Sequence, residues 1–488
     1  MSNPDLAIVI LAAGKGTRLK SSLAKALHRA GGRALVEHVV RACAPLKARK
    51  TIVVVGHQAE EVSAVVEPLG AETVLQQPQH GTGHAMQVVR RALGSAARIV
   101  VVLPGDAPLI RAETLRAMVA AHRAGSAAAT ILTAVVSDPS SYGRIVRKSE
   151  TAVQAIVEES QLSGEQRELN EINSSIYCFS LRKLWPALAQ VRPNNKHREL
   201  YLTDAVGVLA SEGETVLAHV AADSREALGC NTRTDLAEVD RIFREWKRAA
   251  LMDAGVSFQL PETVLIDPDV IAGEDSLLEP GVQLLGKTKL GTRCTIRTGS
   301  VLSDAILGDD VVVEPHCVVS QSRLDDHVVI GPFARLRANT HLQAGSRIGN
   351  FVELKKSTIG EGTKAMHLTY LGDAKIGSKA NIGAGTITCN YDGFHKYPTA
   401  IGNRVFIGSD TTLVAPVRVG EGGYVAAGST ITDHVPADAL AIARGRQVNK
   451  PGWAARKRRE LAAEEKPRKA ARRSKKPRPR RAKKRRRR

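Results

Sequence analysis

An aliphatic residue at every sixth position of the C-terminal half constrains the fold more than any other feature. Ile or Leu occupies positions 330, 336, 342, 348 and 354, and an aliphatic residue occupies 401, 407, 413, 419, 425 and 431. A six-residue period fits neither an α-helix nor a β-hairpin. It is typical of a parallel β-helix, in which each aliphatic side chain points into a prism and a small residue sits at the corner. We therefore predict hexapeptide repeats from about residue 262.

The N-terminal part instead alternates strand-like and helix-like segments. Apolar, β-branched runs at 7–11, 51–56 and 98–106 are separated by helix-like stretches such as GRALVEHVVRACAPL. This alternation is typical of a mostly parallel sheet with helices on its faces, and such sheets bind ligands at the carboxyl ends of their strands. We therefore expect an α/β, Rossmann-like domain over residues 1–231.

A helix is expected to connect the two parts, over residues 232–255. Its apolar positions keep three-to-four spacing, and a glycine follows as a natural stop: these residues are Leu236, Val239, Phe243, Trp246, Ala250 and Gly255. We assign residues 256–453 to a left-handed parallel β-helix. The hexapeptide rhythm breaks at 361–373 and 385–399, and we expect loops to leave the prism at these breaks.

The chain ends in a dense basic segment. Residues 466–488 carry 16 Lys or Arg and no acid, so that +5 of the net charge of +21 remains for residues 1–465. Repulsion between like charges predicts disorder at least from residue 466, within a tail of residues 454–488. The tail is either a solvated extension or a segment that binds polyanions, such as nucleic acid or an anionic membrane, without sequence preference.

Composition argues against several classes of protein. No apolar stretch approaches the roughly 18–20 residues that span a bilayer, and the N-terminus lacks the pattern of a signal peptide. The six cysteines form no CxxC pair and no zinc-type spacing with histidines. We therefore expect free thiols, no structural metal and a cytoplasmic location.

The string LAAGKGTR at residues 11–18 follows the first predicted strand. It lacks the spacing of a Walker A loop, and Leu19 stands where G-x-G-x-x-G requires its third glycine. What remains is a glycine turn with exposed N–H groups and the cations Lys15 and Arg18, which together form a cradle for an anion such as a triphosphate. A plain strand–turn–helix with surface charges is the alternative.

The longer strings LAAGKGTRLKSSLAKALH, VLQQPQHGTGHAM and LPGDAPLI closely resemble the sugar-1-phosphate nucleotidyltransferases. The resemblance implies that the first loop and Lys25 bind nucleotide phosphates, with Arg18 also in a catalytic role. It implies magnesium ligands at Asp106 and Asn231, nucleotide base and ribose contacts at Gln76, Gly81 and Thr82, and contacts to an acetylated sugar at Gly143, Glu158 and Asn173. The loop residues concerned are Leu11, Ala12, Ala13 and Gly14.

These residue types suit the transfer of a nucleotidyl group to a sugar 1-phosphate. Both reactants are anions, so neutralising charge and aligning the attack are the main tasks. Mg²⁺ prefers hard oxygen ligands, and one carboxylate, one amide and the substrate phosphates suffice. Two plainer interpretations stay open: Asp106 as a turn residue after a strand, and Asn231 as a helix N-cap. The family usually has proline where this chain has Ala24, which puts the rigidity around Lys25 in doubt.

The C-terminal strings NFVELKKS, KAMHLTYLGD and TITCNYDG resemble the bifunctional N-acetylglucosamine-1-phosphate uridyltransferase / glucosamine-1-phosphate N-acetyltransferase family. With the N-terminal strings, the resemblance covers roughly residues 5–453. It implies a catalytic base at His367, sugar-phosphate contacts at Arg337, Lys355, Tyr370, Asn381 and Lys396, and acetyl-CoA contacts at Ala384, Asn390, Tyr391, Ser409, Ala427 and Arg444.

The acetyl transfer that this resemblance implies needs a base. A protonated amine has no lone pair with which to attack the thioester of acetyl-CoA, and histidine is suited to remove its proton near neutral pH. Glu353 is a candidate to orient His367 or the substrate amine, and a backbone N–H near Ala384 is a candidate donor to the oxyanion. A surface histidine without a catalytic role is the alternative for His367.

Three classes of function remain at this point. The first is a two-site enzyme that acetylates glucosamine 1-phosphate and then transfers uridylate from UTP to N-acetylglucosamine 1-phosphate, supplying a precursor of peptidoglycan and lipopolysaccharide. The second is a nucleotidyltransferase with a β-helix that only regulates or oligomerises. The third is a non-catalytic assembly or nucleic-acid-binding protein on an enzyme fold. The resemblance favours the first class and implies a homotrimer.

Overall fold

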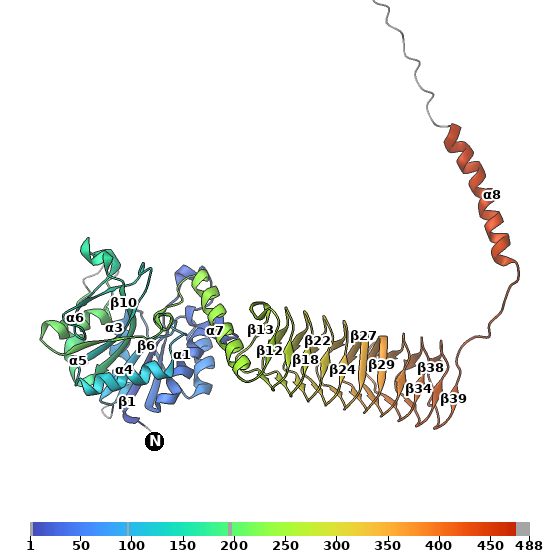
Figure 1. The fold of residues 1–488 in the computed structure, drawn as a ribbon, viewed down its shortest axis with the longest axis horizontal. Helices are drawn as coiled ribbons and strands as arrows, with labels where there is room; N and C mark the ends of the chain where they lie inside the picture. The colour runs from blue at the N-terminus through green and yellow to red at the C-terminus, as the bar shows by residue number, and fades with distance from the viewer. Residues whose placement is uncertain (1–2, 95–96, 194–197, 475–488) are drawn as a thin grey trace, which may run out of the picture.

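The computed structural model describes residues 3–94, 97–193 and 198–474, with side chains described up to residue 465. Figure 1 shows an elongated molecule, with an α/β domain at one end, helix α7 beside it, and a long β-helix that leads to a separate C-terminal helix. This arrangement confirms the predicted fold class, a Rossmann-like domain followed by a run of short parallel strands consistent with a left-handed β-helix.

The sheet of the α/β domain is mostly parallel. Its strand order is β11-β7-β10-β6-β1-β4-β5, and only β10 runs antiparallel to its two neighbours on this path. These strands are β1 (Asn3–Leu11), β4 (Ala48–Val55), β5 (Glu72–Leu75), β6 (Ile99–Pro104), β7 (Ala129–Val135), β10 (Glu171–Ser180) and β11 (Val216–Val220). The hairpin β8 (Arg144–Arg147) and β9 (Val153–Val157) extends from β10, and β2 (Arg29–Ala30) pairs with β3 (Arg33–Ala34).

Helices cover both faces of this sheet, because its central strands are apolar on both sides. Side chains of α3 (Thr82–Leu93), α5 (Leu181–Gln190) and α6 (Leu202–Ser211) form one core with the sheet. Side chains of α1 (Leu35–Cys43), α2 (Ala59–Val66) and α4 (Ala112–Ala124) form the core on the opposite face. The loops at the carboxyl ends of β1, β4, β5 and β6 therefore share one open edge.

Helix α7 (Arg233–Asp253) joins the two domains. It begins with a capping box, in which Thr232 and Asp235 each accept a backbone N–H of the other. Val239 and Ile242 pack into the α/β domain, and Leu251 packs into the core of the β-helix. One helix is therefore buried at both of its ends, against two different cores.

The β-helix stacks coils of about 18 residues, each made of three short strands. Aligned residues of successive coils, such as Ile330 with Ile348 and Leu336 with Leu354, confirm that three hexapeptides form one coil. Two faces form one continuous sheet of strands β12 (Ser257–Phe258), β13 (Leu265–Ile266), β15 (Leu277–Leu278), β16 (Gln283–Leu285), β18 (Thr295–Ile296), β19 (Val301–Ser303), β21 (Val312–Val313), β22 (Val318–Ser320), β24 (Val329–Ile330), β25 (Arg335–Leu336), β27 (Arg347–Lys355), β29 (Lys364–Gly372), β31 (Asn381–Ile382), β32 (Ile387–Cys389), β34 (Phe406–Ile407), β35 (Thr412–Val414), β37 (Tyr424–Val425), β38 (Thr430–Ile431) and β39 (Leu440–Ala441).

The third face is a separate sheet. It contains β14 (Ile271–Ala272), β17 (Lys289–Leu290), β20 (Ile306–Leu307), β23 (Ser322–Leu324), β26 (Thr340–Leu342), β28 (Thr358–Ile359), β30 (Ala374–Ile376), β33 (Thr399–Ile401) and β36 (Val417–Val419). All the periodic aliphatic residues that the sequence singled out point inward and are at most 4% exposed. The period therefore predicted the core correctly.

One of the two expected loop excursions is wrong. Residues 364–372 form the nine-residue strand β29, which pairs along its length with β27, so this segment stays on the prism. The break in rhythm arises because the strand continues across a corner, where Phe351 and Leu368 adopt positive φ angles. The second excursion is present at 390–398. Phe394 is 86% exposed there, and the backbones of Tyr391 and Lys396 form an isolated antiparallel β-bridge.

The expected disorder from residue 466 is also wrong for residues 466–474, since helix α8 (Trp453–Ser474) extends through them. Ala, Arg, Lys and Glu dominate α8 as a whole and favour helix, and within residues 466–474 Ala, Arg and Lys do so despite Pro467. Lys457 also pairs with Glu460 one turn later, which offsets part of the positive charge. Residues 475–488 lie outside the described residues, and the binding of polyanions by the tail stays a prediction. Through the described part of the chain, no helix combines the length and apolarity needed to cross a membrane.

A substitution on one short strand tests the packing of the prism. Ile296→Ala removes a fully buried side chain, and we expect it to lower the free energy of unfolding of the β-helix by about 2–5 kcal/mol. Thr295→Ala, on the neighbouring outward-facing position, is the matched control, with an expected change of about 0.5 kcal/mol or less. Urea unfolding followed by circular dichroism measures both. Equal losses would contradict the assignment of faces.

Candidate functional site

The first group of predicted site residues lies at the shared carboxyl edge of β1, β4, β5 and β6. The N–H of Ala12 donates to the Val54 carbonyl at 2.9 Å, and the N–H of Gly105 donates to the Leu11 carbonyl at 2.8 Å. The loop after β1 is thus held between those after β4 and β6. At Gly14 an added Cβ would meet nothing within 4 Å, so the backbone of this loop faces open space.

Gly16 shows why this loop requires glycine. Its φ is +71°, and a Cβ built there would lie 2.6 Å from the Cβ of Lys25. A side chain at position 16 would therefore displace Lys25. The glycine turn and the lysine that follows nine residues later form one packed unit.

Lys25, Asp106, Asn231 and Arg18 converge on one point. The ammonium of Lys25 forms an ion pair with Asp106 and donates to Asn231 Oδ1 at 2.7 Å. Arg18 Nη2 donates to the same amide oxygen at 2.6 Å. The Cys230 N–H donates to the Asp106 carbonyl at 2.8 Å, which joins the two loops that carry the oxygen ligands. The structure thus brings together both predicted metal ligands and two of the three predicted phosphate-binding cations, Arg18 and Lys25, while Lys15 is exposed outside the cluster.

The donor set at this point fits a hard divalent cation. One carboxylate oxygen and one amide oxygen already contact the same positive charge, that of Lys25, and Mg²⁺ prefers such oxygen ligands. Within the described ranges, no cluster of three or more His, Cys, Asp or Glu side chains is arranged to hold a metal. Further ligands would therefore come from substrate phosphates and water.

Asn231 is not the N-cap of α7. Thr232 occupies that position, and its hydroxyl accepts the N–H of Asp235. Asn231 instead donates its own N–H to Asp235 at 2.8 Å, which leaves its side chain to face Asp106. The N-cap interpretation of Asn231 is therefore wrong.

Residues predicted to contact the nucleotide base lie after β5 and at the start of α3. Gln76 is buried, and its Nε2 donates to the Gly81 carbonyl at 3.0 Å and contacts His84 Nδ1 at 3.2 Å. Thr82 Oγ1 accepts the Leu202 N–H at 2.9 Å, which ties α3 to α6. The structure thus joins Gln76 to Gly81, and it adds His84, which sequence reasoning missed.

The predicted sugar-binding residues form an adjoining group. The Asn173 N–H donates to the Gly143 carbonyl at 2.9 Å, and a Cβ added at Gly143 would lie 3.7 Å from Glu158 Oε2. Partial desolvation of the carboxylate, and then the negative charge of Asp204, raise the pKa of Glu158. The residue as a whole is nevertheless exposed. Tyr142 connects this group to the cation cluster, because its hydroxyl accepts the N–H of Gly229, two residues before Asn231, at 3.4 Å.

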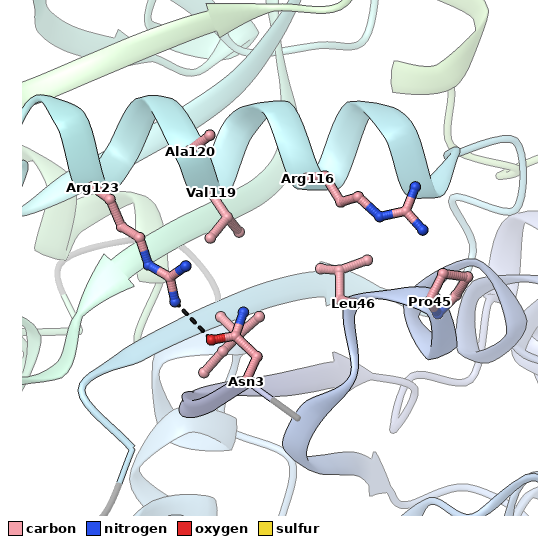
Figure 2. Close-up of a pocket in the computed structure, with 8 residues that line it drawn as sticks. Asn3, Pro45, Leu46, Arg116, Val119, Ala120 and Arg123 are labelled. Carbon is pink, nitrogen blue, oxygen red and sulfur yellow. Dashed lines mark hydrogen bonds between the residues drawn. The ribbon is translucent and has the colours of Figure 1, made fainter. Parts of the chain in front are cut away.

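A pocket beneath α4 lies apart from these residues. Figure 2 shows Arg116 and Arg123 of α4 reaching over Leu46 and Asn3. Arg123 donates to Asn3 Oδ1 and to Asp5 Oδ1, both at 2.8 Å, so its charge is used to fasten β1 to α4. A second cavity lies where α7 meets the first coil of the prism, and it is lined by residues such as Arg33 and Trp246. None of the predicted site residues lines either pocket.

The second group of predicted site residues lies on the β-helix, on neighbouring coils. The register of β27 and β29 sets Asn350 beside His367 and Glu353 beside Tyr370. Arg337 follows β25, and its Nη1 lies 3.0 Å from Glu353 Oε1. Lys355 ends β27 and lies 4.0 Å from Asp373 Oδ2. Residues separated by 17 or 18 positions in sequence thus form one outward-facing surface.

Asn350, and not Glu353, contacts His367. The Asn350 Oδ1 lies 3.1 Å from His367 Nδ1, and an amide oxygen is an acceptor, so Nδ1 carries the hydrogen. In the neutral ring the lone pair then lies on Nε2, and the residue is exposed. Of the two roles considered for Glu353, orienting His367 is not seen, because Glu353 pairs with Arg337, and orienting the substrate amine stays a prediction. Only register across two coils reveals Asn350, and no sequence motif marks it.

Lys355 and Lys396 form a cationic pair from different segments. Lys396 comes from the 390–398 excursion, and its pKa is lowered first by a hydrogen bond from Lys355 that only the neutral amine can accept, and then by the like charge of Lys355. Two ammonium groups that destabilise one another mark a place where an anion would be stabilised. Within the excursion, Asn390 is buried and donates to Asp373 at 2.5 Å, while Tyr391 is exposed.

Four of the six residues predicted to contact acetyl-CoA, Ala384, Ser409, Ala427 and Arg444, follow one corner of the prism, while Asn390 and Tyr391 lie in the excursion. The Asp410 N–H donates to the Ala384 carbonyl at 2.6 Å, the Gly428 N–H to the Ser409 carbonyl at 2.8 Å, and Arg444 Nη1 to the Ala427 carbonyl at 2.8 Å. A Cβ at Gly408 would lie 2.4 Å from the Ala427 nitrogen, so the coils stack with no room for side chains there. A shallow column of small residues results, ending at Arg444.

Comparison with known proteins gives consistent matches. Residues 8–205 match the family model of the MobA-like NTP transferase domain. "Bifunctional protein GlmU" of Koribacter versatilis is 49% identical over 463 residues, covering 94% of this chain and 98% of that protein. The proteins of the same name from Solibacter usitatus and Streptococcus agalactiae are 50% and 44% identical, covering 94% and 92% of this chain and 98% and 97% of their own lengths. A solved UDP-glucose pyrophosphorylase with UDP-glucose has a TM-score of 0.41 over 49% of this chain and 98% of its own, at 16% identity, a likeness too weak to support an inference.

The lysine pair gives a direct electrostatic test. Lys355→Gln removes the like charge beside Lys396, and we expect the pKa of Lys396 to rise toward the ordinary value of lysine. Lys356→Gln is the control, since this neighbouring ammonium lies 3.8 Å from the other oxygen of Asp373. Titration of the lysine side-chain signals by NMR measures both. No rise with Lys355→Gln, or an equal rise with Lys356→Gln, would contradict the pairing.

Proposed function

The chain belongs to the family of bifunctional GlmU proteins, and we propose that it makes UDP-N-acetylglucosamine in two reactions at the two separate groups of residues described above. Glucosamine 1-phosphate is acetylated on the β-helix, and the product then receives uridylate from UTP in the α/β domain. The observation that carries this proposal is the presence, on one chain, of a cation cluster around Lys25 in the α/β domain and, on neighbouring coils of the β-helix, of an exposed histidine oriented by Asn350 and the lysines Lys355 and Lys396.

In the acetyl transfer, His367 acts as the base. Its Nε2 takes a proton from the sugar ammonium, and the amine nitrogen forms a bond to the thioester carbon of acetyl-CoA while the bond from carbon to sulfur breaks. Asn350 holds the ring in the tautomer that this step requires. Arg337, Lys355 and Lys396 bind the sugar phosphate, and Tyr370 and Asn381 complete this subsite. The column from Ala384 to Arg444 binds coenzyme A, with Asn390 and Tyr391 near the acetyl group.

In the uridylyl transfer, an oxygen of the sugar phosphate attacks the α-phosphorus of UTP, and pyrophosphate leaves. The glycine loop, Lys25 and Arg18 bind the phosphate oxygens and stabilise the charge that moves to the leaving group. Asp106 and Asn231 would hold Mg²⁺, which supplies charge neutralisation between the two anionic reactants. Lys25 then turns from these oxygens to the phosphates. Gln76, Gly81 and Thr82 bind the uridine, and Gly143, Glu158 and Asn173 bind the acetylated sugar.

A homotrimer is supported by an apolar ladder along one corner of the β-helix. His316, Phe333 and Phe351 stack with ring centroids 5.3 and 5.5 Å apart, and Leu368 continues the line on the next coil. Phe351 is 57% and Leu368 65% exposed in the single chain. Phe351 directly follows Asn350 in the sequence, and Leu368 directly follows His367. Burial of this ladder against other copies of the chain would cover apolar surface and complete the acetyl-transfer site at the same time.

The two-site assignment predicts that the reactions can be removed separately. Asp106→Ala should lower uridylyl transfer by about 100-fold or more and spare acetyl transfer, because it removes an oxygen ligand for the metal. His367→Ala should do the reverse, by about 100- to 10,000-fold, because the base is lost. The assay is incubation with glucosamine 1-phosphate, acetyl-CoA, UTP and Mg²⁺, with products separated by mass. Loss of both activities from either folded variant would contradict two independent sites.

The apolar ladder predicts a coupled effect on assembly and activity. Phe351→Asp places a charge on the ladder, and we expect it to convert the trimer to monomers and to abolish acetyl transfer, with uridylyl transfer retained. Ile306→Asp is the matched control, because Ile306 is similarly exposed (49%) on the third face and away from the ladder. Sedimentation and both activity assays check this. A monomeric wild type, or a trimeric Phe351→Asp protein, would contradict the proposed interface.

A further inference from the structure

Ala24 immediately precedes Lys25, at the position where the resembled family usually has proline. A proline ring would fix φ and would have no N–H to pair, whereas alanine leaves φ free and adds a donor. In the structure Ala24 is fully buried, with φ −55° and ψ 140°. Its backbone therefore has the φ that a proline would impose, and something other than a ring must hold it there.

Gln58 provides that contact. The Ala24 N–H donates to Gln58 Oε1 at 2.5 Å, across 34 residues of sequence. A buried N–H left without an acceptor is costly, so this bond selects the observed position of the segment. The bond joins the backbone of Ala24 to a side chain that is distant in sequence.

Gln58 is itself held firmly at the carboxyl edge of the sheet. It precedes α2, and its carbonyl accepts the Val62 N–H at 3.0 Å in the first turn of that helix. The residue before it, His57, donates its N–H to the Ala13 carbonyl at 3.1 Å. The backbone of Gln58 is thus tied to the first turn of α2 and, through His57, to the loop after β1.

The backbone of Lys25 is consequently confined from two sides. Gly16 packs against the lysine stem, since a Cβ there would lie 2.6 Å from Lys25 Cβ, and Gln58 holds the preceding peptide. The ammonium lies beside Asp106 and Asn231. A lysine that must reach phosphate oxygens gains from a stem fixed in this way, because misplacement by about 1 Å costs on the order of 100-fold in rate.

We propose that Gln58 is a positioning residue for Lys25, replacing by a hydrogen bond to the Ala24 N–H the restraint that a proline would supply covalently. Gln58 acts only through the peptide of Ala24 and contacts no reacting atom. This inference rests on the proposed uridylyl transfer, and it adds to that function the residue that makes a non-proline sequence competent at this position.

Removal and replacement of the restraint test the proposal. Gln58→Leu keeps the bulk and removes the acceptor, and we expect kcat of uridylyl transfer to fall about 10- to 100-fold. Ala24→Pro alone should also lower this kcat, because the observed φ suits proline but the ring would take the place of the N–H and meet Gln58 Oε1, which lies 2.5 Å from the Ala24 nitrogen. The double variant Gln58→Leu with Ala24→Pro should recover most of the lost activity. Acetyl transfer on the same preparations reports that each variant is folded and assembled.

The outcomes separate this proposal from the proposed function. Wild-type uridylyl activity of Gln58→Leu, or a loss that Ala24→Pro fails to restore, would overturn the positioning role. A wild-type protein without uridylyl transfer would overturn the proposed function itself, and this inference with it. Recovery in the double variant would not occur if Gln58 merely stabilised α2, since proline at position 24 restrains the backbone before Lys25 and does not restore what α2 would have lost.

Discussion

Parallel strand register is the constraint on which both candidate sites depend. In the α/β domain, pairing of β1 with β4 and β6 delivers the ends of three distant strands to one edge, where Lys25 and Asp106 meet. In the β-helix, the same kind of pairing repeats coil after coil, and at β27 and β29 it places Asn350 beside His367. Neither site has a local sequence that could form it alone. Each exists because burial of apolar side chains fixes which residues become neighbours.

Both sites also hold positive charge at close quarters, but they balance it differently. Around Lys25 the charge is neutralised within the protein, by the carboxylate of Asp106 and the amide oxygen of Asn231. On the β-helix, Lys355 and Lys396 stay close together at the expense of a lowered pKa for Lys396. The first arrangement suits a site where a divalent ion and a polyphosphate enter together and take over these partners. The second suits a single phosphate group, which relieves the repulsion when it binds.

The sequence predicted what depends on repetition or on composition. The sixfold period identified the inward residues of the prism, Leu336 and Leu354 among them, because coil stacking leaves no other place for them. It did not identify Asn350 as the partner of His367 or Gln58 as the partner of Ala24, since both are single hydrogen bonds between residues far apart in sequence. The sequence analysis also predicted a loop where the structure has the strand at 364–372, and disorder where it has helix at 466–474. There, continuous pairing with β27 and local helix propensity outweighed a break in rhythm and a run of like charge.

A crystal structure of the full chain with UDP-N-acetylglucosamine, Mg²⁺ and coenzyme A tests the central claim most directly, namely that each parallel register builds one site. The account predicts the nucleotide phosphates at the carboxyl ends of β1 and β6, within reach of Lys25 and Arg18. It also predicts the coenzyme along the corner from Ala384 to Arg444, with its thiol toward His367. Phosphates bound away from Lys25, or a coenzyme bound away from that corner, would contradict it.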